Sequence, residues 1–186
     1  SFFPSKNLGA FGDAGMVTTN NRDLWERMKT IAQHGSRTRY YHDVLGINSR
    51  LDTLQAVVLN VKLRYLDRWN ETRRAHARRY TELLSGVPVT PPSYPPAGDH
   101  IFHQYTLRAP KRDALAAHLK TAGIPHAVYY PIPLHLQKAY AMLGGKSGQF
   151  PVTEQAAAEV LSLPMHTELT EEQMQHIAGA IRTFYA

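Results

Sequence analysis

The sequence of 186 residues contains no cysteine. This absence excludes disulfide bonds, zinc sites with thiolate ligands and cysteine nucleophiles, and it is compatible with a reducing compartment. No apolar run approaches the roughly 20 residues that a membrane-spanning helix needs. The first residues also lack the basic stretch and apolar core of a secretory signal. We therefore expect a cytoplasmic protein with no membrane partner.

The chain does not begin with methionine; its first residues are Ser-Phe-Phe-Pro. Such a start is typical of the interior of a longer chain, so we expect this sequence to be a fragment. Its residues are 43% hydrophobic and 19% charged, which fits a folded globular protein. The length is enough for one substantial domain, or for one large piece and a smaller one.

Acidic residues are outnumbered, with 15 Asp and Glu against 21 Lys and Arg, and the net charge is +6. A basic balance favours anionic partners such as nucleic acids, phosphorylated cofactors and nucleotide-sugars. Seven of the basic residues fall between positions 62 and 79. We interpret this run as the solvated back of a long helix. A nucleic-acid surface is the less favoured alternative, because no binding motif or stacking platform accompanies it.

The first half of the sequence predicts loops that alternate with regular elements. Residues 1–13 are rich in Gly, Ser and Pro and predict a loop, and residues 14–19 predict a short strand. Residues 21–34 predict an amphipathic helix that ends at a glycine. Residues 35–50 predict a long loop, which is a common place for function. Apolar residues at spacings of three and four predict one helix over 51–84.

The prolines between positions 88 and 96 predict a linker, and we place a domain boundary there, between residues 1–86 and 87–186. The second unit predicts an α+β arrangement. Its expected elements are strands at 100–108 and 127–130 and helices at 111–122, 153–162 and 170–185. Thr170 and Gln173 have the spacing of a capping box at the start of the last helix.

Lys6 is the first candidate for chemistry. A lysine amine can attack a carbonyl when it is enclosed and electrostatically tuned. The hydroxyls of Ser1 and Ser5 near this amine suit a phosphate-bearing aldehyde, since the amine takes the aldehyde and the hydroxyls take the phosphate. From these residues alone, a surface lysine in a turn remains the stronger alternative.

The ten histidines raise the question of a metal site. His100 and His103 are three residues apart, a spacing that places them on opposite faces of a strand. No further histidine stands nearby to complete a ligand set. We expect no metal site.

Four segments carry a resemblance to a known family. They are S-F-F-P-S-K-N-L-G-A-F-G-D-A-G-M-V-T-T-N at the start, H-G-S-R-T-R-Y-Y-H-D-V-L-G-I-N-S-R-L-D-T-L-Q-A from position 34, Y-Y-P-I-P-L-H-L-Q from position 129 and F-P-V-T-E-Q-A-A-A-E-V-L-S-L-P-M-H from position 150. In this order they resemble the DegT/DnrJ/EryC1/StrS sugar aminotransferases. That family depends on pyridoxal 5'-phosphate (PLP) and has the aminotransferase fold of type I.

The resemblance implies the residues that bind the cofactor. Lys6 matches the lysine that carries PLP as a Schiff base and later moves the proton between cofactor and substrate carbons. Ser1 matches a serine that bonds the PLP phosphate. Asn48 matches an asparagine that reaches the same phosphate from the partner subunit, although an ordinary turn asparagine is the alternative.

The resemblance also implies residues for the substrate. Arg50 matches an arginine suited to the carboxylate of 3-oxo-glucuronate sugars, the branch that the segment N-S-R-L-D-T-L-Q-A resembles most; bonding to a loop carbonyl is the alternative. His34 and Arg37 are candidates for sugar or nucleotide contacts, but capping of a helix end explains His34 almost as well. Tyr130 and His135 belong to a segment that borders the substrate cavity. Tyr129 departs from the pattern, because histidine is common there.

The fold implied is α/β: the C-terminal part of a fold-type-I aminotransferase, with the end of the large PLP domain, a long connecting helix and a small α+β C-terminal domain. The activity implied is transfer of an amino group, with glutamate as the expected donor, to a nucleotide-linked keto-sugar in a homodimer with shared active sites. The acid that faces the PLP ring nitrogen and the group that stacks on the ring would lie upstream of Lys6. A noncatalytic fragment or dimerisation module is therefore the alternative.

Overall fold

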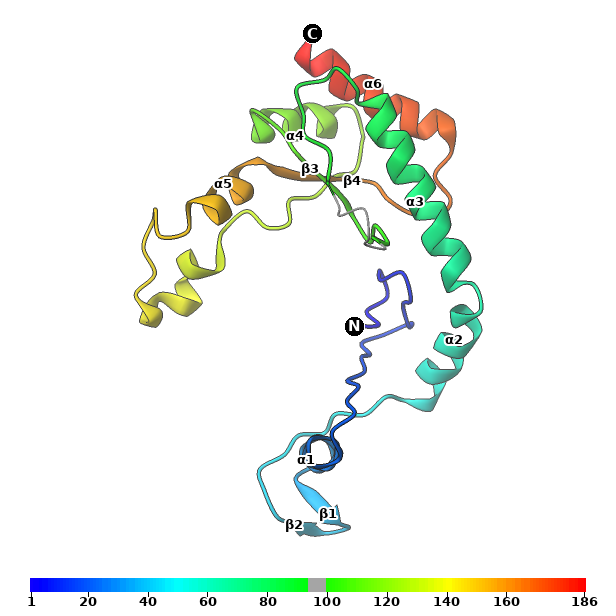
Figure 1. Ribbon diagram of the computed structural model, residues 1–186, viewed down its shortest axis with the longest axis vertical. Helices are drawn as coiled ribbons and strands as arrows, with labels where there is room; N and C mark the ends of the chain where they lie inside the picture. Colours follow the sequence, from blue (N-terminus) through cyan, green and yellow to red (C-terminus); the bar gives the residue numbers. More distant parts are fainter. Residues whose placement is uncertain (94–99) are drawn as a thin grey trace. The chain divides into compact units, whose positions relative to one another are not determined.

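The computed structural model describes residues 1–93 and 100–186. The chain divides into two compact units, Ser1–Arg68 and Trp69–Ala186 (Figure 1). The division falls inside helix α3 (Leu66–Leu83) and not at the 86/87 boundary that the prolines predict. Pro95 and Pro96 of that linker lie outside the described residues. Among the described residues, no helix combines the length and the apolar character needed to cross a membrane.

The first unit contains helix α1 (Arg22–Ala32), strands β1 (Ser36–Thr38) and β2 (Tyr41–His42), and helix α2 (Thr53–Leu63). Residues 1–13 form a loop, as the sequence predicts. The strand predicted at 14–19 is wrong, since this segment has no strand assignment. A strand needs a hydrogen-bonded neighbouring strand, and the described residues provide none for this segment.

Helix α1 confirms the predicted helix at 21–34. The side chain of Asn21 accepts a hydrogen bond from Leu24 N at 3.0 Å and so caps the first turn. After the helix, the chain forms the antiparallel hairpin β1–β2 inside the segment predicted as one irregular loop. Gly35 makes this possible, because a Cβ atom added there would lie 1.7 Å from Val44 O. A side chain at this position would separate the two arms.

The single helix predicted over 51–84 is wrong. The structure has two helices, α2 and α3, separated at Arg64 and Tyr65. Tyr65 N donates to Lys62 O at 3.0 Å, so the α-helical hydrogen bond tightens here to the three-residue spacing of a 3₁₀ turn. The sequence has no Gly or Pro at this point, so nothing in its pattern signals the break.

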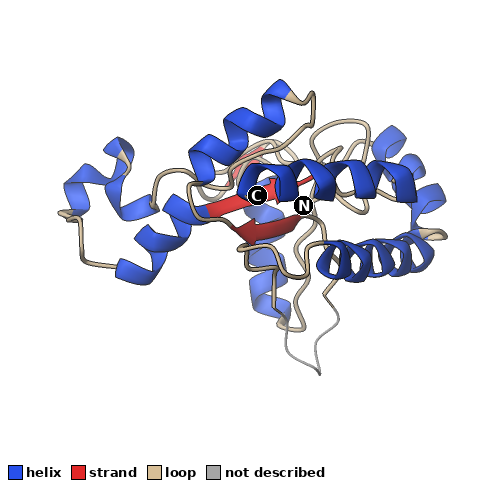
Figure 2. Ribbon diagram, turned by 90° about the horizontal axis from the view of Figure 1, so that it is seen from above, coloured by secondary structure: helices blue, strands red, loops and turns tan. Residues whose placement is uncertain are grey.

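The second unit is built on a two-stranded antiparallel sheet of β3 (Tyr105–Arg108) and β4 (Val160–Leu163), and helices pack against this sheet (Figure 2). Tyr105 faces Leu163 and Arg108 faces Val160. The remaining elements are listed here in chain order: α4 (Arg112–Thr121), the 3₁₀ helices η1 (Leu134–Leu136) and η2 (Lys138–Leu143), α5 (Pro151–Glu159) and α6 (Glu171–Tyr185).

The strands of this unit differ from those expected. The strand predicted at 100–108 shrinks to β3, and the one predicted at 127–130 is reduced to a single bridge between Ala127 and Ser162. The helix predicted over 153–162 ends at Glu159, and the chain continues as β4. These corrections share a cause: β4 forms because β3 lies beside it, and that partner is more than 50 residues away in sequence.

The core of the second unit lies between the sheet and helices α3, α4 and α6. Its largest fully buried side chains include Tyr80 of α3, Tyr105 of β3, Leu115 of α4 and Ile181 of α6. Helix α3 therefore contributes its buried face to this core, which explains why the unit begins within that helix. Burial of this apolar area is the main favourable contribution to folding.

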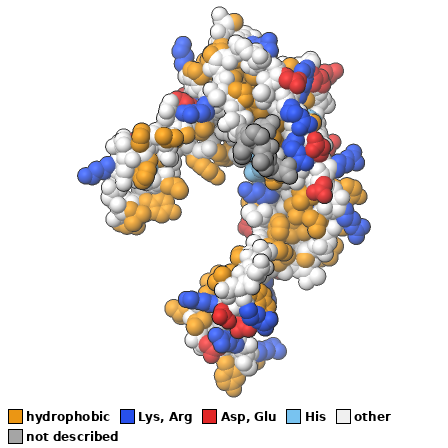
Figure 3. Space-filling view, in the orientation of Figure 1, with side chains coloured by type: hydrophobic (Ala, Val, Ile, Leu, Met, Phe, Trp, Pro, Cys, Tyr) orange, Lys and Arg blue, Asp and Glu red, His pale blue; other side chains and the backbone are white. Residues whose placement is uncertain are grey.

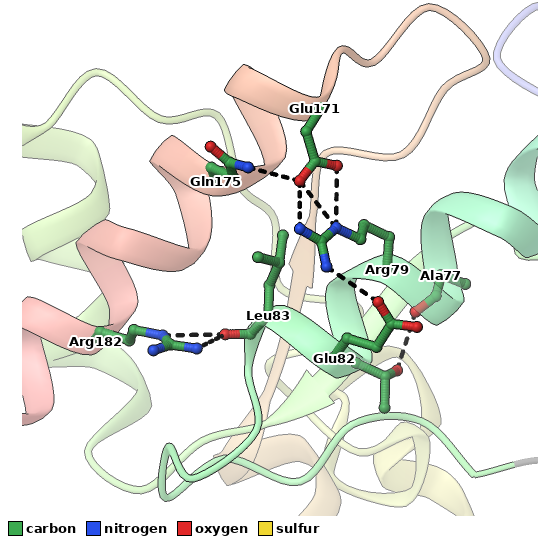
Figure 4. A network of polar contacts seen from close by, with 8 residues as sticks. Ala77, Arg79, Glu82, Leu83, Glu171, Gln175 and Arg182 are labelled. Carbon is green, nitrogen blue, oxygen red and sulfur yellow. Dashed lines mark hydrogen bonds and ion pairs between the residues drawn. The ribbon is translucent and has the colours of Figure 1, made fainter.

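The arginines of α3 are not only a solvated face. Arg79 contacts both carboxylate oxygens of Glu171 on α6 and also pairs with Glu82 at 3.1 Å, while Arg182 of α6 donates to Leu83 O (Figure 4). For Arg73 the prediction of a solvated position is wrong, since this residue is only 8% exposed. The basic run thus joins two helices and fills part of the interior.

Candidate functional site

The loop of residues 1–13 forms a tight turn around Lys6. Lys6 N donates a hydrogen bond to Phe3 O at 2.9 Å, and Ala10 N donates to Phe2 O at 2.8 Å. The Lys6 side chain is half-buried, and its amine has no hydrogen bond or ion pair with the residues that the structure describes. A half-buried amine without an anionic partner is available to a ligand.

A cleft of about 910 Å³ in the first unit is bordered by three of the predicted site residues, Ser1, Asn48 and Arg50. The rest of its wall comes from Phe3, residues 13–17, part of α1 and the neighbours of Asn48. Lys6 does not line this cleft. The structure therefore brings together a hydroxyl, an amide and a guanidinium from residues that are far apart in the sequence. They lie next to the loop that carries Lys6.

Backbone hydrogen bonds fix the segment that carries Asn48 and Arg50. Ile47 N donates to Ile31 O at 2.8 Å and Ser49 N donates to Ala32 O at 3.0 Å, so the segment runs along the end of α1. The side chains of Asn48 and Arg50 are exposed and have no hydrogen-bond partner within residues 1–93 and 100–186. Both groups remain able to bind an anionic ligand.

His34 and Arg37 lie on the hairpin side of α1 and outside this cleft. His34 N donates to Ile47 O at 3.0 Å, and His34 O contacts the imidazole of His42 at 2.9 Å. Arg37 lines a separate cavity of about 190 Å³ with Arg27 and Asp43. The roles of His34 and Arg37 in substrate binding stay predictions.

Tyr130 and His135 belong to the second unit. Tyr130 is exposed and lines a cavity of about 380 Å³ with Tyr129 and residues of α5. His135 does not line this cavity; its Nε2 lies 3.1 Å from Glu154 Oε1, and its ring meets that of Phe150 edge-on. Their roles at a substrate also stay predictions.

Glu154 organises the segment that follows His135. Its carboxylate accepts hydrogen bonds from Gly148 N at 2.9 Å and from Phe150 N at 3.2 Å. These bonds, led by the one from Gly148, lower the pKa of the Glu154 carboxyl, and burial opposes them. The carboxylate thus ties the segment with η1 and η2 to the start of α5.

Two residues that contact the Lys6 loop were not selected from the sequence. Gln55 Oε1 accepts a hydrogen bond from Phe11 N at 2.8 Å, and Lys62 Nζ donates to Gly9 O at 2.6 Å. Gln55 stands inside one of the segments that carry the family resemblance, which could have drawn attention to it. In the sequence, Lys62 is distinguished only as the first residue of the basic run between positions 62 and 79.

The described residues contain no group of three or more His, Asp or Glu side chains that could hold a metal ion. His100 and His103 precede β3 and do not lie within a strand. The prediction that a strand places them on opposite faces is therefore wrong.

Comparison with known proteins places the chain in a family. The model of the DegT/DnrJ/EryC1/StrS aminotransferase family matches residues 1–182. The chain belongs to this family. A solved structure, DesV of S. venezuelae in complex with a ketimine intermediate, superimposes with a TM-score of 0.93 at 41% identity over 99% of this chain and 50% of that chain. This agreement confirms the predicted α/β fold and its placement in the C-terminal part of the family's fold.

The relatives differ in what their names describe. A "pleiotropic regulatory protein" of Geobacillus stearothermophilus is 56% identical over all of this chain and 50% of its own length. A UDP-N-acetyl-3-dehydro-alpha-D-glucosamine 3-aminotransferase of Acidithiobacillus ferrooxidans is 47% identical over 98% of this chain and 49% of its own length. A UDP-2-acetamido-2-deoxy-3-oxo-D-glucuronate aminotransferase of Pseudomonas aeruginosa is 41% identical over 97% of this chain and 50% of its own length, so the expected glucuronate branch is among the relatives. The chain spans about half the length of these curated relatives.

Proposed function

We propose that this chain provides the cofactor lysine of a PLP-dependent aminotransferase that acts on a nucleotide-linked keto-sugar, in the cytoplasm and with an amino acid such as L-glutamate as donor. The observation that carries the proposal is the placement of Lys6 in a tight loop whose residues Ser1 and Phe3 border a cleft. Family membership over residues 1–182 supports the same reaction class.

The chemistry of these residues fits the cofactor. A primary amine suits an aldehyde, and hydroxyl and amide groups are good donors to a phosphate. When bound, PLP supplies an electron-withdrawing ring that lets an amino group move between carbon skeletons. The role of Lys6 is to hold the cofactor and to carry a proton at Nζ, and Ser1 and Asn48 hold the phosphate, with Asn48 acting on the site of the partner subunit.

Arg50 gives the proposal its substrate preference. Its guanidinium borders the same cleft as Ser1 and has no carboxylate partner among the described residues. A free guanidinium pairs with a carboxylate or phosphate through two parallel hydrogen bonds. We therefore assign Arg50 to an anionic group of the sugar nucleotide. Both the glucuronate and the glucosamine relatives act on UDP-linked sugars, so the diphosphate is the anion common to the two.

A direct test is to add PLP to the purified protein, record the visible absorbance band, reduce with borohydride and map the modified peptide. We expect the modification on Lys6, and we expect band and modification to be lost in Lys6→Ala. The matched control is Lys120→Ala, which removes an exposed lysine of α4 in the second unit and should change neither.

The same test separates the second candidate function, a noncatalytic fragment or dimerisation module. That candidate would use the large apolar side chains that the first unit exposes, among them Leu45 and Tyr40. A protein that stays colourless with excess PLP, or one modified at a lysine other than Lys6, would support the module and contradict the proposed enzyme.

A further inference from the structure

The loop that carries Lys6 has no helix or strand of its own. A reactive amine must nevertheless be held closely, because small errors in position reduce catalysis strongly. Side chains on a rigid neighbouring element can provide that support. In the first unit, helix α2 is the element whose side chains contact this loop.

Two side chains of α2 hold the loop at adjacent points. Lys62 Nζ donates to Gly9 O at 2.6 Å and also lies 4.9 Å from the centroid of the Phe11 ring. Gln55 Oε1 accepts from Phe11 N at 2.8 Å. The two residues are seven positions apart, so they project from the same face of the helix. One contact fixes a carbonyl of the loop and the other fixes an amide, which defines the loop's orientation as well as its distance from α2.

Gly9 connects these contacts to Lys6. Gly9 is buried, and a Cβ atom added to it would lie 2.3 Å from Pro4 O and 2.9 Å from Phe3 O. The backbone of Gly9 therefore lies directly against the turn in which Phe3 O accepts the hydrogen bond from Lys6 N. A displacement of Gly9 would move this turn, because both are close-packed backbone.

Each of the two contacts fixes one backbone atom of the loop, and the one from Lys62 has a charged donor. Lys62 has no carboxylate partner among the described residues, so its charge is directed at the Gly9 carbonyl. The Gln55 side chain gives the exposed Phe11 amide a fixed acceptor on α2, where exchangeable water would otherwise bind. We infer that Gln55 and Lys62 are positioning residues that set the place of the Lys6 amine from helix α2; the inference rests on the proposed function of Lys6.

The test uses the full chain with and without PLP, in the variants Lys62→Met and Gln55→Leu. In both, we expect the amides of Phe11 and Ala10 to exchange hydrogen about tenfold faster, as the loss of one hydrogen bond allows. We also expect the pH at which the visible band of the PLP-loaded protein changes to shift from its wild-type value. A merely structural loss elsewhere would not move that pH.

Gln55→Glu is the conservative variant, because a carboxylate oxygen can accept the same hydrogen bond from Phe11 N. It should keep the wild-type exchange rate of Phe11; the pH of the spectral change is not compared for this variant, because the added carboxylate charge shifts that pH by itself. Asn60→Ala, at an exposed position of α2, is the surface control and should behave as the wild type.

Two outcomes overturn the inference, and they are distinguishable. Wild-type exchange and wild-type spectral pH in both Lys62→Met and Gln55→Leu, with Lys6 still modified by borohydride, would remove the positioning role alone. Absence of a Lys6 adduct in the wild-type protein would remove the proposed function and, with it, the role assigned to the two side chains.

Discussion

Arg73 is a charged residue that belongs to the interior of the second unit. Its Nη1 donates to Phe102 O at 3.0 Å, to His103 O at 3.2 Å and to Met165 O at 3.0 Å. Burial lowers the pKa of its guanidinium. The side chain therefore joins α3 to the segment before β3 and to the segment after β4.

We predict that Arg73→Met destabilises the protein by about 3 kcal/mol, because it removes three hydrogen bonds made by a largely buried charged group. The measurement is the free energy of unfolding from a denaturant titration. Arg78→Met on the same helix is the matched control: Arg78 is 55% exposed and, among the described residues, forms an ion pair only with Glu71, so its removal should cost less than about 1 kcal/mol. Equal losses in the two variants would contradict the structural role of Arg73.

At the scale of elements, the segment from His135 to Phe150 depends on one carboxylate. Glu154 accepts hydrogen bonds from the amides of Gly148 and Phe150 and contacts His135 Nε2. Its pKa is lowered in the folded protein below the ordinary value of 4.5. A carboxyl with a lowered folded pKa stabilises the protein above its unfolded pKa, and this contribution is lost as the pH falls through the folded value.

We therefore predict that Glu154→Gln is less stable than the wild type at neutral pH, and that the difference shrinks as the pH falls below 4.5. Unfolding titrations at a series of pH values would measure it. Glu172→Gln is the control, because its carboxylate has no hydrogen bond among the described residues. A stability difference for Glu154→Gln that stays constant from neutral to acidic pH would contradict the assignment.

Elements with local causes could be predicted from the sequence. The capping box of Thr170 and Gln173 is present at the start of α6, with Gln173 N donating to Thr170 Oγ1 at 3.2 Å. Helices α1 and α4 also form where their apolar periods place them. The strands could not be predicted in the same way, because β3 and β4 depend on each other across more than 50 residues.

The candidate site could likewise be predicted only in part. The resemblance selected Ser1, Asn48 and Arg50, and the structure places all three around one cleft. The contacts of Gln55 and Lys62 could not be predicted, because their partners are backbone atoms that lie 44 and 53 residues away in the sequence. A positioning role is visible only when the distances are known.

At the scale of the whole molecule, the hairpin and the segment after it expose large apolar side chains. Leu45 is 98% exposed and Tyr40 is 77% exposed, and orange side chains are visible on the surface at this end of the first unit (Figure 3). Exposed apolar groups of this size mark interaction surfaces. This exposure supports the proposal that residues 35–50 contact a second copy of the chain and bring Asn48 to its cofactor lysine.

A shared active site makes a prediction that a self-contained site does not. If Asn48 serves the partner's Lys6, then mixing Lys6→Ala with Asn48→Ala and exchanging subunits creates one intact site per heterodimer. Aminotransferase activity should then rise above that of either variant alone, measured as keto-sugar amination after dissociation and reassembly. The control is a mixture of Lys6→Ala with the double variant Lys6→Ala/Asn48→Ala, which contains no intact site in any pairing. The cleft that Asn48 and Ser1 border within one chain offers the opposing geometry, in which Asn48 serves its own subunit. In that case the first mixture gains nothing, because every Lys6 would remain paired with an altered Asn48.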